Sequence, residues 1–161
     1  MTLLPSRASL QDDAAFAAFS CIAPGAPSTP WLEEVDNYIR AALLRASDLH
    51  VLAFREGDNL VAVSAFYESR IGIPVVQPAD HPAWHLEVLA VAHQRHRNGI
   101  GLQVLDHTLA TMQELDPHIV FVVARAHADN DASIRLCAKR DITLFLPDGA
   151  YQVLLGELKA A

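Results

Sequence analysis

The chain has 161 residues, of which 52% are apolar and 19% charged, a composition that predicts one globular domain over residues 1–161 and excludes a disordered chain. The formal net charge of −7 argues against a protein that coats nucleic acid or an anionic membrane. The sequence lacks a signal-peptide pattern and a long apolar run, and Cys21 and Cys137 form no C-x-x-C motif, so a cytoplasmic protein with free thiols is expected.

The N-terminal part predicts one edge strand and two helices. Residues 2–5 have the pattern of a short strand that a proline ends. Ser9–Asp12 is a capping box, which predicts a helix through about Ile22 with its aromatic residues facing the core. A second helix is expected to begin at Pro30, with Thr29 as its cap. Its apolar stripe comprises Leu32, Val35, Ile39, Ala42 and Leu43.

A hairpin follows, and a long connection comes after it. The segments Leu49–Arg55 and Asn59–Ser69 have the pattern of strands joined by the turn at residues 56–59. The segment Ile71–Pro82 contains three prolines and is long for a hairpin connection. Such a segment is either a binding loop or lid, or an ordinary solvated surface loop.

The C-terminal half predicts alternating strands and helices. Trp84–Val91 is a strand, Ile100–Leu115 a helix, and His118–Ala124 a second strand buried on both faces, which together make a right-handed βαβ unit. A short helix at Ala132–Arg140 precedes the closing elements. They are strands at Ile142–Phe145 and Tyr151–Leu155, paired as an antiparallel hairpin. The expected fold is α/β, with a mixed sheet of six or seven strands and helices on both faces.

The segment between Val91 and the helix at Ile100 has the features of an anion site. The first N–H groups of a helix lack intrahelical partners, and phosphate is their usual ligand. The chain contains no Gly-Lys pair, which excludes a P-loop, and Gly99-x-Gly101 lacks the third glycine of a dinucleotide fingerprint. Arg95 and Arg97 add positive charge, and so does His96 when it is protonated.

The same segment resembles the GNAT superfamily of acyl-CoA-dependent N-acyltransferases. The family signature is [Q/R]-x-x-G-x-[G/A] after a strand that ends in valine, and His96–Gly101 fills it with His96 in place of Gln or Arg. A second family element is similar to Val123–Ile142, which keeps the Asn at position 130. This element departs from the family at Cys137, Asp141 and Ile142, where the family has Tyr, Gly and Phe.

The resemblance implies an acetyl-CoA site and its residues. The backbone N–H groups of residues 97–102 would hold the pyrophosphate. The main chain of Leu89–Val91 would pair with the pantetheine arm as an added strand does, and Asn130 would fix that arm. The residues expected at this site are Leu89, Ala90, Val91, Arg95, His96, Arg97, Asn98, Gly99, Ile100, Gly101, Leu102 and Asn130.

His85 and Glu87 are candidate general bases. Alternation along the strand places them on one face with Leu89 and Val91. Transfer of an acyl group to nitrogen needs a neutral amine, so a carboxylate or an imidazole has to accept a proton, directly or through water. The alternative is that Glu87 pairs with a surface cation and His85 is a hydrogen-bonded core residue.

Cys137 occupies the position of the family's Tyr, which protonates the departing thiolate. It is either a replacement acid or a small buried residue of the core. Tyr67 and Tyr151 also carry phenols. The pairs His81/His85 and His93/His96 have metal-like spacings, but no further ligand completes either set, so no metal is expected.

The expected function is transfer of an acetyl group from acetyl-CoA to a primary amine by direct attack in a ternary complex. A backbone N–H at the end of the Trp84–Val91 strand would hold the oxyanion. The alternative is a GNAT-fold module that binds acyl-CoA as a sensor or partner domain and no longer catalyses. The amine acceptor is not readable from the sequence. The expected partners are acetyl-CoA and an amine, without nucleic acid or membrane, in a monomer or a homodimer.

Overall fold

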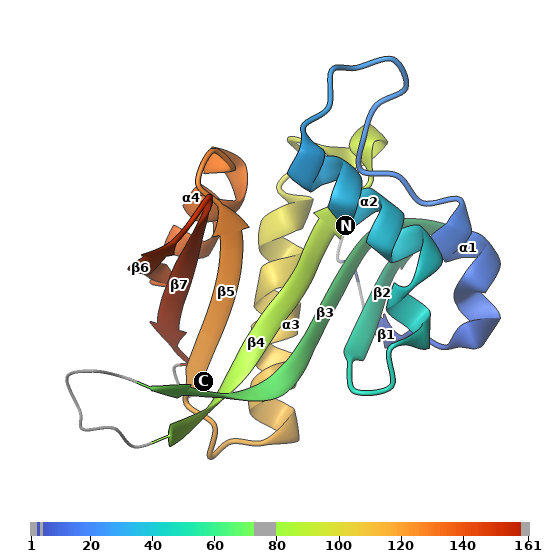
Figure 1. Cartoon of the computed structure of the whole chain (residues 1–161). Helices are drawn as coiled ribbons and strands as arrows, with labels where there is room; N and C mark the ends of the chain where they lie inside the picture. The colour runs from blue at the N-terminus through green and yellow to red at the C-terminus, as the bar shows by residue number, and fades with distance from the viewer. Residues whose placement is uncertain (1–2, 4, 73–79, 159–161) are drawn as a thin grey trace. The chain divides into compact units, whose positions relative to one another are not determined.

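Seven strands form one open, mixed sheet in the order β1-β2-β3-β4-β5-β7-β6 (Figure 1). The computed structural model describes residue 3 and residues 5–72 and 80–158. β4 and β5 are parallel, whereas β1–β2, β5–β7 and β6–β7 are antiparallel. The predicted mixed α/β sheet is therefore confirmed. Within the described residues, no helix is long and apolar enough to cross a membrane.

The elements have the following bounds. The strands are β1 (Pro5–Arg7), β2 (His50–Glu56), β3 (Asn59–Gly72), β4 (Asp80–Val91), β5 (Phe121–His127), β6 (Thr143–Asp148) and β7 (Tyr151–Glu157). The helices are α1 (Asp13–Ala17), α2 (Pro30–Ala41), α3 (Ile100–Leu115) and α4 (Asp131–Ala138), with short 3-10 turns η1 (Leu10–Asp12), η2 (Leu43–Arg45) and η3 (His93–Arg95).

The chain divides into two compact units, unit 1 with residues Met1–Ala65 and Val88–Thr108, and unit 2 with Phe66–Glu87 and Leu109–Ala161. In unit 1, one face of the sheet packs against α1 and α2. The helices and the segments that follow them contribute apolar side chains that pack on alternate residues of β2, β3 and β4. This core comprises Phe16, Phe19, Cys21, Ile39, Leu43, Val51, Ala53, Val63, Ala65, Val88, Ala90 and Ala92.

The opposite face of the unit 1 sheet packs against α3. Phe54 is fully buried, and its ring centroid lies 6.1 Å from that of His107. The buried hydroxyls of Ser64 and Thr108 share a hydrogen bond of 2.7 Å, so two polar groups in this interface satisfy each other. Helices therefore cover both faces of this part of the sheet, as predicted.

In unit 2, β5 lies between β4 and β7. His85 pairs with Val123, and Val123 in turn pairs with Leu155. Val122 and Leu154 are fully buried. The parallel β4–β5 pairing confirms the predicted βαβ unit, and the closing β6–β7 hairpin is also confirmed, with β7 inserted between β5 and β6.

The N-terminal elements differ from the prediction at two boundaries. The edge strand is Pro5–Arg7 rather than residues 2–5, of which 2 and 4 lie outside the described residues. The capping box at Ser9 is confirmed, but α1 ends at Ala17 and does not reach Ile22. The N–H groups of Cys21 and Ile22 bind side chains instead of helical carbonyls: that of Cys21 donates to the buried carboxylate of Asp36 at 2.8 Å, and that of Ile22 to the Ser20 hydroxyl at 3.1 Å.

Three strand boundaries are also corrected. β4 begins at Asp80, four residues before the predicted start, and β3 extends to Gly72, so the predicted loop is shorter and its residues 73–79 lie outside the described residues. β5 begins at Phe121 rather than His118. The N–H of His118 donates to the Asp116 side chain and that of Ile119 to the Asp116 carbonyl, which holds these residues in a turn.

Gly156→Ala tests the closeness of β7 to the segment before β6. A methyl group there would lie 2.7 Å from Ile142 Cγ1 and 3.1 Å from Ile142 Cα. We expect the variant to lose about 1–3 kcal/mol of unfolding free energy in urea titrations, the usual cost of overpacking. Gly-to-Ala replacements in unstrained positions are normally stabilising, so an equal or higher stability would contradict the tight packing.

Candidate active site

The turn between β4 and α3 in unit 1 exposes a row of backbone N–H groups. Arg97 and Gly99 have positive φ angles of 63° and 73°. The N–H groups of residues 97–101 donate no hydrogen bond to another described residue, whereas that of Leu102 reaches the Gly99 carbonyl at 3.2 Å. Five consecutive donors therefore remain at the positive end of the α3 dipole, a suitable site for a phosphate anion. Leu102, which was expected in this set, has its N–H occupied.

The two arginines of the turn differ in whether their guanidinium groups pair with a carboxylate. Arg95 forms an ion pair with Glu56, whose side chain is only 15% exposed. Arg97 is exposed and pairs with no carboxylate of the described residues. Of the two, Arg97 therefore has the guanidinium that is available to an anionic ligand, and Arg95 has a structural partner that sequence analysis missed. Because Glu56 lies at the end of β2, far from Arg95 in the chain, no local sequence pattern indicates this pair.

The last residues of β4 present main-chain groups on the edge that faces away from β3. The N–H of Ala92 donates to the Val61 carbonyl of β3 at 2.8 Å. Main-chain groups alternate between the two edges of a strand, so those of Leu89 and Val91 lie on the other edge. The imidazole Nε2 of His96 already donates to the Val91 carbonyl at 2.8 Å.

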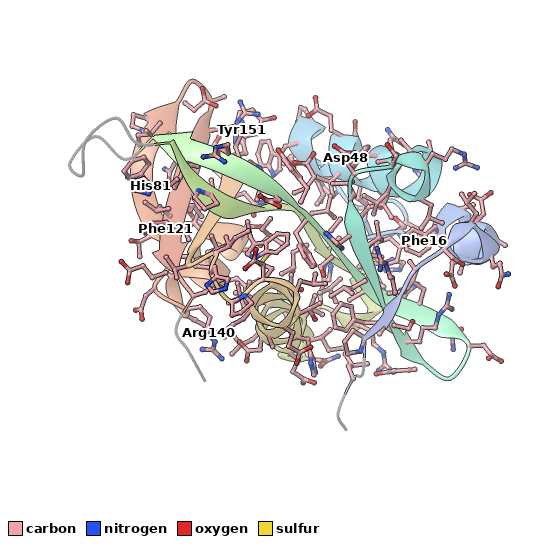
Figure 2. All side chains as sticks on the ribbon, turned by 90° about the horizontal axis from the view of Figure 1, so that it is seen from below. Phe16, Asp48, His81, Phe121, Arg140 and Tyr151 are labelled. Atoms are coloured by element: carbon pink, nitrogen blue, oxygen red, sulfur yellow. The ribbon has the colours of Figure 1, made fainter. Side chains whose placement is uncertain are left out.

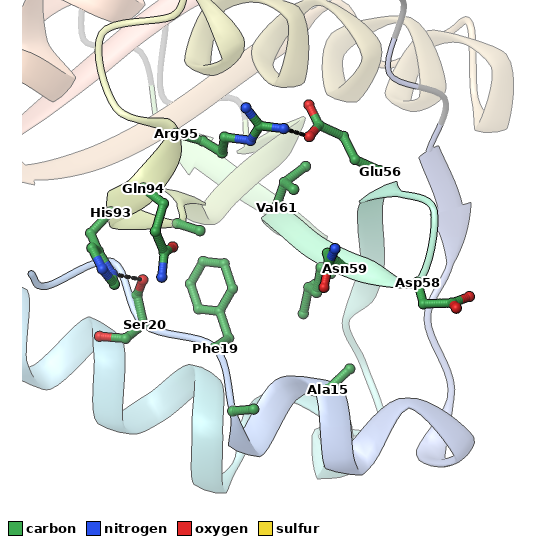
Figure 3. Close-up of a pocket in the computed structure, with 13 residues that line it drawn as sticks. Ala15, Phe19, Ser20, Glu56, Asp58, Asn59, Val61, His93, Gln94 and Arg95 are labelled. Carbon is green, nitrogen blue, oxygen red and sulfur yellow. Dashed lines mark hydrogen bonds and ion pairs between the residues drawn. The ribbon is translucent and has the colours of Figure 1, made fainter.

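A cavity of about 420 Å³ lies beside this turn in unit 1 (Figure 3). Figure 3 shows the Arg95–Glu56 ion pair on one side and His93 against Ser20 on another. The Ser20 carbonyl accepts from the His93 N–H at 3.1 Å and lies 3.3 Å from its Nδ1. The cavity was not anticipated from the sequence, because its walls come from segments far apart in the chain.

In unit 2 the structure brings His85 and Glu87 close together. Their side chains are 20% and 38% exposed, and His85 Nε2 lies 3.7 Å from Glu87 Oε2, beyond hydrogen-bond distance. Tyr67 stacks on the His85 ring with centroids 4.9 Å apart. Burial lowers the pKa of His85 below its usual 6.5, an effect that Glu87 opposes and Arg125 reinforces. His85 is therefore a neutral imidazole at neutral pH and can accept a proton.

Arg125 is a further residue of this region that sequence analysis missed. Its Nε donates to Asp148 Oδ2 at 2.8 Å, and its guanidinium carbon lies 4.0 Å from the centre of the Tyr151 ring. His127 packs against the same ring edge-on, with centroids 5.3 Å apart. Figure 2 shows Tyr151 on one side of this part of the sheet and Arg140 on the other. The only sequence signal is that Arg125 interrupts an apolar strand.

Asn130 and Cys137 belong to α4. Asn130 is its N-cap, and its side-chain oxygen accepts from the Ser133 N–H at 3.2 Å. The side-chain NH2 of Asn130 donates to no described residue. Cys137 is buried, and burial raises its pKa to about 11. The thiol is thus fully protonated at neutral pH. Cys137 and Cys21 are both free.

The histidines with metal-like spacing are not brought together as metal ligands in the described residues. His93 contacts the Ser20 carbonyl and His96 the Val91 carbonyl, so their rings are directed to different main-chain groups. Over residues 5–72 and 80–158, no three His, Cys, Asp or Glu side chains are arranged to hold a metal ion.

Comparison with known proteins connects these features to one family. The chain is similar in structure to the PaiA N-acetyltransferase from Thermoplasma acidophilum in complex with coenzyme A, with a TM-score of 0.72 and 15% identity over 98% of this chain and 99% of the other. For a mutant of the AtaT toxin, bound to the C-terminus of the antitoxin AtaR and acetyl-CoA, the TM-score is 0.72, with 14% identity and coverage of 98% and 94%.

A third similar structure is the ribosomal-protein-S18-alanine N-acetyltransferase from Escherichia coli, with a TM-score of 0.67 and 12% identity over 99% of this chain and 96% of the other. At these identities the likeness establishes the fold. A search of curated proteins gives no match. The sequence profile described as the acetyltransferase (GNAT) family matches residues 14–141. The chain therefore belongs to the acetyltransferase (GNAT) family.

Proposed function

We propose that the protein is an N-acetyltransferase that moves an acetyl group from acetyl-CoA to a primary amine by direct attack in a ternary complex. The observation that carries the proposal is the row of five free N–H groups at residues 97–101, in a chain whose sequence matches the GNAT profile. Such a row fits a pyrophosphate, which offers several anionic oxygens to successive donors.

The donor site follows from the β4–α3 turn. The N–H groups of residues 97–101 hold the pyrophosphate, and the Arg97 guanidinium adds charge. Gly99 leaves the approach open, since nothing lies within 4 Å of the position of a Cβ there. The main-chain groups of Leu89 and Val91 pair with the pantetheine amides like an added strand.

The chemistry requires proton removal from the amine and stabilisation of an oxyanion. The amine nitrogen attacks the thioester carbon, the carbon–sulfur bond breaks, and CoA leaves as a thiolate that takes up a proton. Glu87 accepts the proton of the amine, and the neutral His85 beside it supports the same role. A backbone N–H at the end of β4 donates to the oxyanion of the tetrahedral intermediate.

The assignment of the acid follows from relative pKa values. A proton is transferred readily from an acid whose pKa is near or below that of the acceptor. Cys137, with a pKa of about 11, lies above an ordinary thiol at ~8.5, so its proton would move uphill to the CoA thiolate. We therefore assign Cys137 a packing role, and the thiolate takes its proton from solvent or from the protonated base.

Gly101→Glu tests the donor site. We expect the glutamate to add bulk and a negative charge close to the free N–H groups, so titration calorimetry should detect no acetyl-CoA binding. Gln113→Glu is the matched control, because it adds the same charge near the far end of α3, and it should keep the wild-type affinity. A folded Gly101→Glu protein with unchanged affinity would refute the assignment of the site.

Glu87→Gln tests the base. We expect kcat to fall by about 10²–10⁴, the usual contribution of a general base, with little change in the KM for acetyl-CoA. The pH dependence of kcat/KM distinguishes titration of His85 from deprotonation of the amine. Because the pKa of His85 is lowered, activity that depends on this residue rises at a pH below 6.5. Activity that depends on deprotonation of the amine rises instead around the pKa of the amine. Activity that survives Glu87→Gln and His85→Ala combined would move the base elsewhere.

Cys137→Ala tests the packing role. We expect kcat to stay within about twofold, while the unfolding free energy falls by ~0.5–3 kcal/mol, the usual range for single substitutions. Cys137→Ser is the matched control, since its hydroxyl is a hydrogen-bond donor of similar size. A large loss of kcat in the Ala variant that the Ser variant restores would show that the thiol donates a proton.

A further inference from the structure

In unit 2, β5 carries a cation, Arg125, and it pairs with the strand that carries the candidate base Glu87. The β4–β5 ladder pairs His85 with Val123 and ends at Leu86 and Ala124. Glu87 and Arg125 are therefore the first residues of the two neighbouring strands beyond the ladder. Because side chains alternate along a strand, Arg125 shares the face of Val123 and His85. Arg125 also lowers the pKa of His85, which agrees with this proximity.

The guanidinium of Arg125 is held in place and still has unused donors. Its Nε binds Asp148 at 2.8 Å, and its plane is supported by the Tyr151 ring at 4.0 Å. The Nη1 and Nη2 groups donate to no described residue, and the side chain is 47% exposed. A guanidinium with two free Nη groups is suited to a planar, bidentate acceptor such as a carboxylate.

The charge of Arg125 is only partly compensated. Asp148 is 50% exposed, so solvent screens the pair and its attraction is small. Glu87, 38% exposed, lies on the neighbouring strand with no cation paired to it among the described residues. The same face of unit 2 thus offers a carboxylate that attracts an ammonium and a guanidinium that attracts an anion.

We propose that the acceptor is an amino carboxylate, such as a free α-amino acid, whose amine meets Glu87 and whose carboxylate binds the Nη groups of Arg125. This inference rests on the proposed acetyltransferase function and names its substrate class. Arg125 then determines specificity for the acceptor and takes no part in holding acetyl-CoA. Tyr151 and Asp148 act as positioning residues that fix the plane of the guanidinium.

The test compares matched acceptors in a thiol-release assay with the full chain. The acceptors are the free amino acids, their carboxamides and the corresponding decarboxylated amines, with rates referred to the fraction of neutral amine. We expect wild-type kcat/KM to be highest for the free amino acids. Arg125→Gln should raise the KM for the preferred amino acid by about ten- to a hundredfold, the value of a charged hydrogen bond. It should leave the KM for acetyl-CoA unchanged and should lower the rates with carboxamides far less than those with the free amino acids.

Two further variants keep the result interpretable. Arg125→Lys retains the positive charge but lacks the two Nη groups. Its KM for the preferred amino acid should therefore lie between those of wild type and Arg125→Gln. Arg135→Gln, which removes an exposed arginine of α4 paired with Asp131, should leave the acceptor preference unchanged. Equal use of amino acids and carboxamides by wild type, or equal losses with both in Arg125→Gln, would overturn the inference and leave the proposed function standing. No thiol release from any acceptor, despite acetyl-CoA binding, would overturn both.

Discussion

The five backbone N–H groups at residues 97–101 are the constraint on which unit 1 depends. Free donors are tolerated only where water or a ligand can reach them, so the turn has to stay exposed and yet keep its shape. Contacts of the preceding residues meet this requirement. Ala92 bonds to β3, His93 to the Ser20 carbonyl and Arg95 to Glu56. Each of these contacts comes from a different segment, so the turn is fixed from several sides while its own N–H groups remain unused.

Unit 2 contains the titratable groups His85 and Cys137, and burial is the main cause of the shift in each pKa. Tyr67 covers one face of His85, which reduces its contact with water and disfavours the imidazolium form. Burial also disfavours the charged form of Cys137, which is the thiolate, and therefore raises the pKa of the thiol. The same physical cause therefore keeps His85 neutral down to a lower pH and makes Cys137 a poorer proton donor.

The sequence predicted the features that depend on neighbouring residues and missed those that depend on distant ones. The capping box, the start of α2 and the start of α3 are local signals, and all are confirmed. The end of α1 at Ala17 depends on Asp36, which takes the N–H of Cys21 and is itself buried at 2% exposure. The Arg95–Glu56 ion pair likewise joins a turn to a hairpin. Such pairings depend on the tertiary fold, so periodicity and motif spacing carry no sign of them.

The histidine at position 96 has a consequence for how a pantetheine arm can pair with β4. Strand-like pairing needs carbonyl acceptors and N–H donors on the free edge of Leu89 and Val91. The Nε2 of His96 occupies the Val91 carbonyl at 2.8 Å, so an incoming amide either displaces the imidazole or pairs with the Leu89 groups and the Val91 N–H alone.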